Sequence, residues 1–199
     1  MKNITIFVLL FNLIFMQTNT NKTETAIFAG GCFWCTEAIF KELKGVQSVV
    51  PGYIGGKRKN PTYEQVVTGA TEHAEAIKIV FNSEIISYEE LLQVFFATHD
   101  PTTLNRQGND VGTQYRSAVF YTNEKQKELA KSYISFLEKE DVYDSYIETE
   151  VTSATDFYEA EDYHKNYLAN NPQNRYCQYV ILPKLQKFRK QFKEKRNEK

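Results

Sequence analysis

Residues 26–35, with the sequence AIFAGGCFWC, join a short apolar strand to a helix through two glycines. The strand is expected at Ala26–Ala29, and a helical pattern runs from Cys32 to Leu43. A thiol at the first residue of a helix faces unpaired backbone N–H groups and the positive end of the helix dipole. This placement predicts a lowered pKa for the Cys32 thiol and a reactive site where the strand ends.

Two more strands are predicted after this helix. Val46–Val50 forms the first, and a turn-rich stretch, residues 51–61, follows it. Residues 75–81 alternate between two faces, and Glu75 shares one face with Ile77, Ile79 and Phe81. A carboxyl group on an apolar face resists ionisation, so we expect a raised pKa for Glu75.

The second half of the chain continues the alternation of helices and strands. A capping box of Ser87 and Glu90 opens a helix that ends near residue 100, before a polar loop over residues 101–116. A strand at 117–121, a helix at 124–138 and a half-exposed strand around residues 147–151 follow. The order predicts an α+β fold, a two-layer α/β sandwich with one mixed β-sheet and a ferredoxin-like core.

Composition limits the classes of protein that the chain can represent. It has 199 residues, of which 42% are hydrophobic, and 24 Lys and Arg balance 25 Asp and Glu. This length fits one domain with a substantial core, so neither a disulfide scaffold nor a structural metal is needed for folding. The near-neutral charge argues against a dedicated nucleic-acid binder.

The two ends of the chain differ from its middle. Residues 1–20 carry Lys2, an apolar run over residues 4–16 and a polar exit, which predicts a signal peptide and export to the periplasm or cell envelope. An uncleaved anchor and a buried strand are the alternatives, and the protein is cytoplasmic if the segment is not functional. Residues 21–188 are then expected to form the main domain. Residues 189–199 form a basic tail. The basic stretch 184–199 is expected to be a solvated helix that frays rather than a patch for nucleic acid or membrane.

The chain has three cysteines, and these are the first candidates for reactive or metal-binding residues. Cys32 and Cys35 form a C-x-x-C pair one helical turn apart, whereas Cys177 lies in a distant, tyrosine-rich segment that is expected to be poor in helix. The simplest interpretation is that Cys32 and Cys35 are two small buried side chains of an ordinary helix. A zinc site with Cys177 and His164 is a second, although no further C-x-x-C or histidine pair follows. A thioredoxin-like thiol–disulfide oxidoreductase is a third.

Further motifs make the chain resemble the A-type peptide methionine sulfoxide reductases. The resemblance covers residues 26–188 and rests on several blocks that occur in the same order. They are Gly30–Cys35, Gly52–Gly56, Asn60–Val66, His73–Ala76, His99–Thr102, Asn105–Asp110, Gly112–Ser117, Glu159–Tyr167 and Tyr176–Cys177. The resemblance implies the family fold, which agrees with the predicted element order, and thiol-dependent reduction of methionine S-sulfoxide, free or in proteins that are repaired in this way.

The resemblance also implies a role for individual residues. Cys32 is implied as the nucleophile that becomes a sulfenic acid, and Glu75 as the acid that protonates the sulfoxide oxygen. Tyr63 and Tyr115 are implied to hydrogen-bond that oxygen, with Asp110 ordering them. The pocket for the substrate's methyl group is implied at the aromatic residues Phe33, Trp34 and Tyr176.

Cys35 and Cys177 are both candidates to resolve the sulfenic acid to a disulfide. Many relatives have glycine at the position of Cys35 and resolve from the C-terminal segment, so the order of the two thiols stays open. The final reductant is expected to be thioredoxin or a thioredoxin-like protein. We expect a monomer that needs no bound cofactor or metal.

Overall fold

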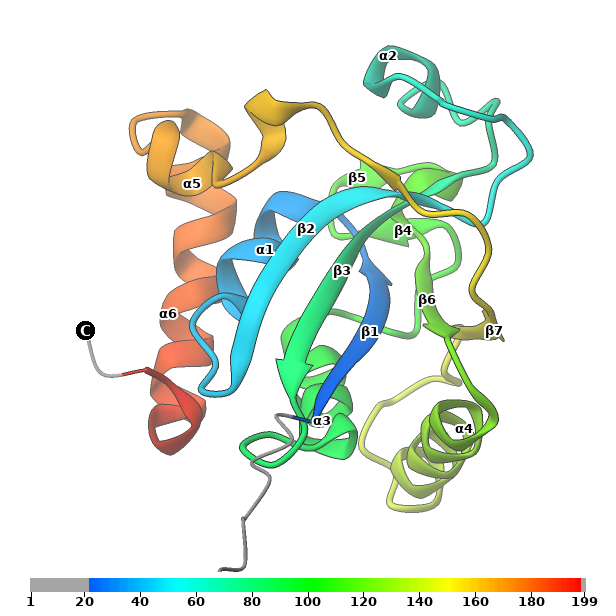
Figure 1. The fold of residues 1–199 in the computed structure, drawn as a ribbon, viewed down its shortest axis with the longest axis vertical. Coiled ribbons are helices and arrows are strands. Elements are labelled where there is room, and N and C mark those ends of the chain that lie inside the picture. The colour runs from blue at the N-terminus through cyan, green and yellow to red at the C-terminus, as the bar shows by residue number, and fades with distance from the viewer. Residues whose placement is uncertain (1–21, 198–199) are drawn as a thin grey trace, which may run out of the picture.

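A six-stranded sheet lies at the centre of the structure, a computed structural model that describes residues 22–197 (Figure 1). The strand order is β7-β6-β1-β3-β2-β8, and only the β6–β7 pair is parallel, so the sheet is mixed, as predicted. Its strands are β1 (Thr23–Gly30), β2 (Val46–Ile54), β3 (Ala74–Asn82), β6 (Ser117–Tyr121), β7 (Glu150–Ser153) and β8 (Tyr158–Glu159). A separate hairpin pairs β4 (Arg106–Gln107) with β5 (Asp110–Val111).

Helices cover one face of this sheet, which confirms the two-layer α+β arrangement. The large core cluster on that face contains Phe28 of β1, Ile79 of β3 and Leu92 of the helix α3 (Tyr88–Thr98). A smaller cluster on the opposite face includes Ile27 and is covered by residues that follow β7. The helices are α1 (Phe33–Phe40), α2 (Tyr63–Val66), α3 (Tyr88–Thr98), α4 (Glu124–Lys139), α5 (Tyr167–Asn170) and α6 (Leu182–Gln191).

Two glycines make the sharp turn from β1 into α1. A Cβ atom on Gly30 would lie 2.9 Å from the ring of Phe95, so a larger residue would displace the core. Gly31 has φ +85°, and its Cβ atom would lie 2.5 Å from the side chain of Gln107. The chain therefore passes close beneath the hairpin before α1 begins, which sets Cys32 at the edge of the loop over residues 101–116.

The second strand is longer than the sequence pattern predicts. It was expected to end at Val50, but β2 continues to Ile54 through Pro51. The carbonyl of Pro51 accepts the N–H of Ala160 at 2.9 Å. Because the N and O atoms of one antiparallel residue face the same neighbouring strand, the missing N–H of Pro51 faces the short edge strand β8. The proline thus leaves the ladder between β2 and β3 intact.

The C-terminal segment packs on the domain, so the expectation of a fraying helix end is wrong. Leu185 and Phe188 of α6 are buried in the main core. Arg189 and Arg196 both form ion pairs with Glu42 near the end of α1, the second at 3.1 Å. The positive charges that predicted a solvated tail instead hold the segment against a nearly buried carboxylate.

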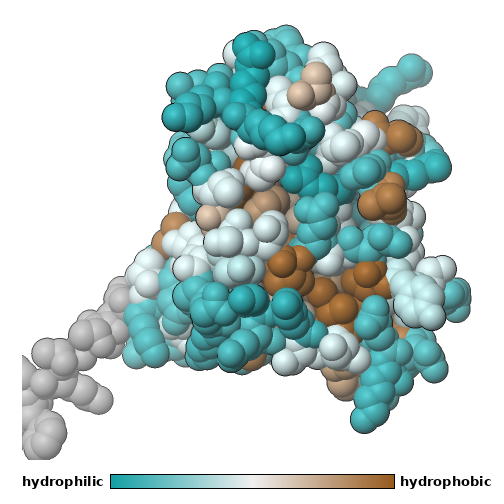
Figure 2. Space-filling view, turned by 90° about the vertical axis from the view of Figure 1, so that its right-hand side faces the viewer, coloured by the Kyte–Doolittle hydropathy of each residue, from teal (hydrophilic) through white to brown (hydrophobic). Residues whose placement is uncertain are grey.

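Exposed hydrophobic side chains gather on one face of the molecule. Figure 2 shows hydrophobic side chains gathered on the lower half of the face that carries α4 and β7; Phe136 and Val142 are among the exposed hydrophobic residues of that part of the chain. Within residues 22–197, no helix combines the length and the apolar character that a membrane span requires. The predicted signal peptide lies outside the described residues.

Candidate active site

The three thiols lie in one buried cluster beside the first turn of α1. Cys32 caps this helix, and its carbonyl accepts the N–H of Cys35 at 3.1 Å. Cys177 is fully buried against both of them, together with Ile181. All three are free thiols. Cys177 begins a π-helical turn, Cys177–Ile181, that runs on into α6, so the expectation of a helix-poor segment here is wrong: packing against α1 overrides weak local helix signals.

The two thiols of the C-x-x-C pair differ in acidity. Burial raises the pKa of Cys32 well above its ordinary value, and a hydrogen bond to Cys35 and the charge of Glu75 add to this. The pKa of Cys35 is lowered, first by the hydrogen bond from Cys32 and then by the nearby positive charge of Lys184, against burial. The prediction of a low pKa at Cys32 is therefore wrong, because burial outweighs the helix N-terminus there, and the lowered pKa of the pair belongs to Cys35.

Glu75 provides a buried carboxyl group next to Cys32. Its side chain lies on the core face of β3 and is 1% exposed. The backbone N–H of Phe33 donates to its Oε2 atom at 3.1 Å. Burial raises the pKa of Glu75 to about 8, although the Phe33 N–H acts in the opposite direction. The raised pKa predicted from the strand alternation is confirmed, and the group is a neutral acid near pH 7.

The two tyrosines implied by the sequence come from separate segments that converge on this carboxyl group. Tyr63 is the first residue of α2, and Tyr115 ends a short 3-10 turn, Thr113–Tyr115. Both are half-buried. Burial, and then the charge of Glu75, raise the pKa of each phenol, so both hydroxyls stay protonated and can donate a hydrogen bond. Cys32 also contributes to the raised pKa of both phenols, which indicates that the two rings lie near this thiol.

Asp110 also lies at this site, where its charge acts on both Glu75 and Tyr115. Its Oδ2 atom accepts the hydroxyl of Tyr176 at 2.7 Å. This bond joins the β4–β5 hairpin to the segment that carries Cys177. Asp110 therefore orders Tyr176 directly, and its charge also contributes to the raised pKa of Tyr115 and of Glu75.

Aromatic side chains form one wall of the site, with Trp34 at its centre. The indole ring stacks on Tyr167 with ring centroids 3.6 Å apart, and Tyr176 meets it edge-on at 5.8 Å. Phe33 is 1% exposed and packs against Tyr53 in the core, so Trp34 offers the more accessible surface of the two. Flat apolar rings suit a methyl group and exclude water.

Two residues at the site were missed as functional candidates by the sequence analysis. Glu161 accepts the N–H of Tyr63 at 2.8 Å and the hydroxyl of Tyr53 at 2.7 Å. His164 accepts the indole N–H of Trp34 at 3.1 Å. Their only signal in the sequence is the block Glu159–Tyr167, and His164 was considered only as a possible zinc ligand. Within residues 22–197, no three His, Cys, Asp or Glu side chains are arranged to hold a metal ion.

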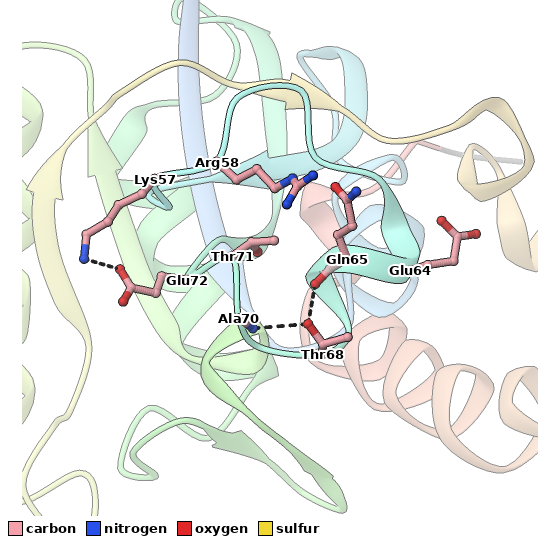
Figure 3. Close-up of a pocket in the computed structure, with 8 residues that line it drawn as sticks. All are labelled: Lys57, Arg58, Glu64, Gln65, Thr68, Ala70, Thr71 and Glu72. Atoms are coloured by element: carbon pink, nitrogen blue, oxygen red, sulfur yellow. Dashed lines mark hydrogen bonds and ion pairs between the residues drawn. The ribbon is translucent and has the colours of Figure 1, made fainter.

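A hollow beside α2 is not part of this site. It is lined by the loop after β2 and by the outer side of α2, and Figure 3 shows Lys57 paired with Glu72 and Thr68 bonded to Gln65 and Ala70. The lining contains neither a thiol nor a histidine. The reactive groups lie instead at the thiol cluster of Cys32, Cys35 and Cys177.

Comparisons with known sequences agree on one family. The model of the family described as "Peptide methionine sulfoxide reductase" matches residues 24–196. The chain is 56% identical over 169 residues to the peptide methionine sulfoxide reductase MsrA of Chromobacterium violaceum, covering 85% of this chain and 96% of the relative. It is 55% identical over 172 residues to that of a Nitratiruptor species, covering 86% and 98%.

Solved structures give the same result at lower identity. Methionine sulfoxide reductase A of Corynebacterium diphtheriae is similar with a TM-score of 0.68 and 34% identity, covering 78% of each chain. The reduced form of Mxr1 from Saccharomyces cerevisiae is similar with a TM-score of 0.71 and 34% identity, covering 80% of this chain and 91% of that one.

Proposed function

Because the chain belongs to the peptide methionine sulfoxide reductase family, we propose a mechanism in which Cys32 is the nucleophile and Glu75 is the acid. The protein is an oxidoreductase that reduces methionine S-sulfoxide to methionine with thiols as electron donors. The observation that carries the proposal is the buried, protonated carboxyl group of Glu75, bonded to the residue next to Cys32. Plain disulfide exchange, the alternative function, removes no oxygen atom and so needs no acid to protonate one.

The first step needs a thiolate at Cys32 and a proton on the sulfoxide oxygen. The hydrogen bond between the two sulfurs lets Cys35 accept the Cys32 proton as the attack proceeds, and formation of the new bond at Cys32 drives a transfer that the two pKa values alone oppose. The Cys32 sulfur then attacks the substrate sulfur while Glu75 protonates the oxygen. Transfer of that hydroxyl to Cys32 forms a sulfenic acid and releases methionine, so the substrate sulfur gains two electrons and Cys32 loses two.

Substrate binding is assigned to the groups around this pair. Tyr63 and Tyr115 donate hydrogen bonds to the sulfoxide oxygen, supported by their half-buried, protonated phenols. The indole of Trp34 receives the methyl group, with Phe33 beneath it and Tyr176 at its edge. Asp110 holds Tyr176 in place.

The second step resolves the sulfenic acid. The Cys35 sulfur attacks Cys32, the disulfide forms, and the hydroxyl leaves as water with the proton of Cys35. Cys177 lies in the same cluster and acts next, by attacking Cys35 and freeing Cys32. A protein dithiol of the thioredoxin type then reduces the resulting disulfide, which returns the site to its resting state.

Three wider assignments belong to the same proposal. Residues 21–188 form the catalytic domain of a monomer, followed by the basic segment 189–199. Residues 1–20 direct export to the periplasm or envelope, supported by Lys2 and the apolar run after it. Proteins damaged by oxidation are then the substrates that are repaired.

An assay with separated epimers tests the function. Each epimer of N-acetyl-methionine sulfoxide is offered to the protein with dithiothreitol, and methionine formation is measured. The S epimer is expected to be reduced and the R epimer left unchanged. Equal turnover of both epimers, or of neither, would contradict the proposed site.

A further inference from the structure

A lysine lies beside the buried side of α6, the helix that packs against α1 (Figure 1). Ile181, Leu185 and Phe188 are buried and mark this side of the helix. Lys184 follows Ile181 by three residues and precedes Phe188 by four, so the helical repeat places its side chain near theirs. It is half-buried, whereas Lys187, one turn further along, is exposed. The ammonium group of Lys184 therefore has less access to water than that of a surface lysine.

No carboxylate pairs with this ammonium group among residues 22–197. Lys184 lines a hollow of about 260 Å³ between the end of α3 and α6. The one carboxylate of that lining, Asp100, accepts the backbone N–H of Thr102 at 2.9 Å and its hydroxyl at 2.6 Å. By contrast, Arg189 of the same helix pairs with Glu42. A partly buried cation without a carboxylate is unfavourable unless another negative charge lies close to it.

The thiol of Cys35 is the group near Lys184 that can carry such a charge. It shares one buried cluster with Ile181, on the same side of the helix as Lys184. The pKa of Cys35 is lowered first by the hydrogen bond from Cys32 and then by the charge of Lys184, against burial. Burial, and then the same charge, also lower the pKa of His99, which lines the hollow. The ammonium group thus lies between the hollow and the thiol cluster.

The charges around Cys35 are otherwise neutral or negative. The titratable groups of the described residues that act on it, or on which it acts, are Cys32, Glu75, Asp110, Tyr176, Cys177 and Lys184. Lys184 is the one cation in this set. The hydrogen bond of Tyr176 also favours a thiolate on Cys35, whereas the charge of Asp110 opposes it. A negative charge on Cys35 is therefore offset by a full positive charge from the side of α6.

We propose that Lys184 is a positioning residue that stabilises the negative charge of Cys35 as this sulfur attacks the sulfenic acid of Cys32. The proposal rests on the proposed function of the two cysteines. In this step Cys35 gives up its proton, the S–S bond forms and the S–O bond of Cys32 breaks. The hydroxide leaves as water with the proton that Cys35 gave up. The Cys35 sulfur is oxidised and the sulfenic acid sulfur is reduced, so no external electron donor takes part.

The test compares two lysines that line the same hollow. Lys184→Met removes the charge and keeps a side chain of similar length, and Lys184→Arg returns a positive charge to the same position. Lys187→Met is the matched control, because it removes an exposed charge one turn away. Thermal unfolding of all variants checks that each one folds cooperatively.

The first measurement titrates Cys35 alone. The chain has three cysteines, so Cys32→Ser and Cys177→Ser together leave Cys35 as the single thiol, and the serine hydroxyl can still donate a hydrogen bond to it. Ultraviolet absorbance of the thiolate is followed against pH. Lys184→Met should raise the midpoint by about one pH unit, while Lys184→Arg and Lys187→Met stay within about 0.3 of the parent. An unchanged midpoint in Lys184→Met, or an equal rise in Lys187→Met, would overturn the proposal.

The second measurement follows one turnover in the Cys177→Ser background, with methionine release and the Cys32–Cys35 disulfide timed separately. Below both midpoints, a rise of about one pH unit leaves about a tenth of the thiolate, and the greater nucleophilicity of a less acidic thiol recovers part of this loss. In Lys184→Met the disulfide should therefore form about threefold more slowly. Methionine release should change by less than about 1.5-fold, because Cys35 accepts a proton in that step rather than giving one up.

An equal slowing of both steps in Lys184→Met, or no rescue by Lys184→Arg, would also overturn the proposal, because a loss of packing rather than of charge would explain it. A parent protein that releases no methionine would instead contradict the proposed function. In that case the titration of Cys35 would by itself decide whether Lys184 stabilises the thiolate.

Discussion

The backbone N–H of Phe33 donates to the carboxyl group of Glu75 at 3.1 Å and so joins the first residue of α1 to the core face of β3. This bond fixes the acid beside the nucleophile, because Phe33 follows Cys32 directly. It also explains why the carboxyl group is tolerated in the core: one of its oxygens is satisfied, while burial keeps the group protonated near pH 7.

The substitution Glu75→Gln tests the acid. Glutamine can keep the bond from Phe33 but cannot supply a proton, so the single-turnover rate should fall by about 10²–10⁴ with little change in substrate affinity. The wild-type rate should also decline above about pH 8, where the carboxyl group ionises, and the variant should lack this decline. Rapid-quench measurements from pH 6 to 10 check both effects. A loss below about threefold would exclude Glu75 as the acid.

The same substitution should stabilise the fold at alkaline pH. The pKa of Glu75 is about 8 in the folded protein and 4.5 as its ordinary value, so between these pH values the folded state binds a proton that the unfolded state has lost. Stability contributed by the neutral carboxyl group is therefore full below about pH 4.5 and is lost as the pH rises toward 8.

Urea unfolding at pH 5 and pH 8 measures this effect. The advantage of Glu75→Gln over the wild type should grow between the two pH values, by an amount on the order of 1 kcal/mol per pH unit as an upper limit. An advantage that stays constant with pH would mean that Glu75 does not have a raised pKa.

Cys35 is expected to resolve the sulfenic acid before Cys177. The Cys35 thiol lies within hydrogen-bonding reach of Cys32 and has the lower pKa of that pair, whereas Cys177 has a raised pKa because of burial. In Cys177→Ser, the Cys32–Cys35 disulfide should form at the wild-type rate. Rapid alkylation and peptide mass mapping identify the first disulfide. If Cys35→Ser forms Cys32–Cys177 at the wild-type rate while Cys177→Ser accumulates sulfenic acid, the order is reversed.

Export predicts a processed N-terminus. Protein recovered from the native envelope or medium should begin between about Thr18 and Ala26, because a signal peptidase removes the segment before the domain. Intact-mass spectrometry of both the exported and the cytosolic fractions checks this. A soluble cytosolic protein that retains Met1 is incompatible with the predicted signal peptide.

The sequence predicted best those features that depend on local periodicity. The alternation over residues 75–81 correctly placed Glu75 with Ile77 and Ile79 on the core face, and the capping box at Ser87 and Glu90 has both of its hydrogen bonds. Each depends on neighbours within a few residues, which the sequence displays directly.

Features set by long-range packing were not predictable in the same way. The raised pKa of Cys32 follows from burial by the distant segment around Cys177, and this burial outweighs the effect of the helix N-terminus. The docking of the C-terminal segment depends on Glu42, a residue whose pairing with Arg189 spans most of the chain. Nothing in the sequence indicates that His164 lies beside Trp34, because 130 residues separate them.

The most direct test of the central claim is one turnover without external reductant. Fully reduced wild type, Cys177→Ser and Cys32→Ser are each mixed with excess methionine S-sulfoxide, and methionine and free thiols are counted per chain. The wild type and Cys177→Ser should each release at least one methionine and lose two thiols for the first one, while Cys32→Ser should release none. Methionine release from Cys32→Ser at the wild-type rate would contradict the assignment of Cys32 as the nucleophile.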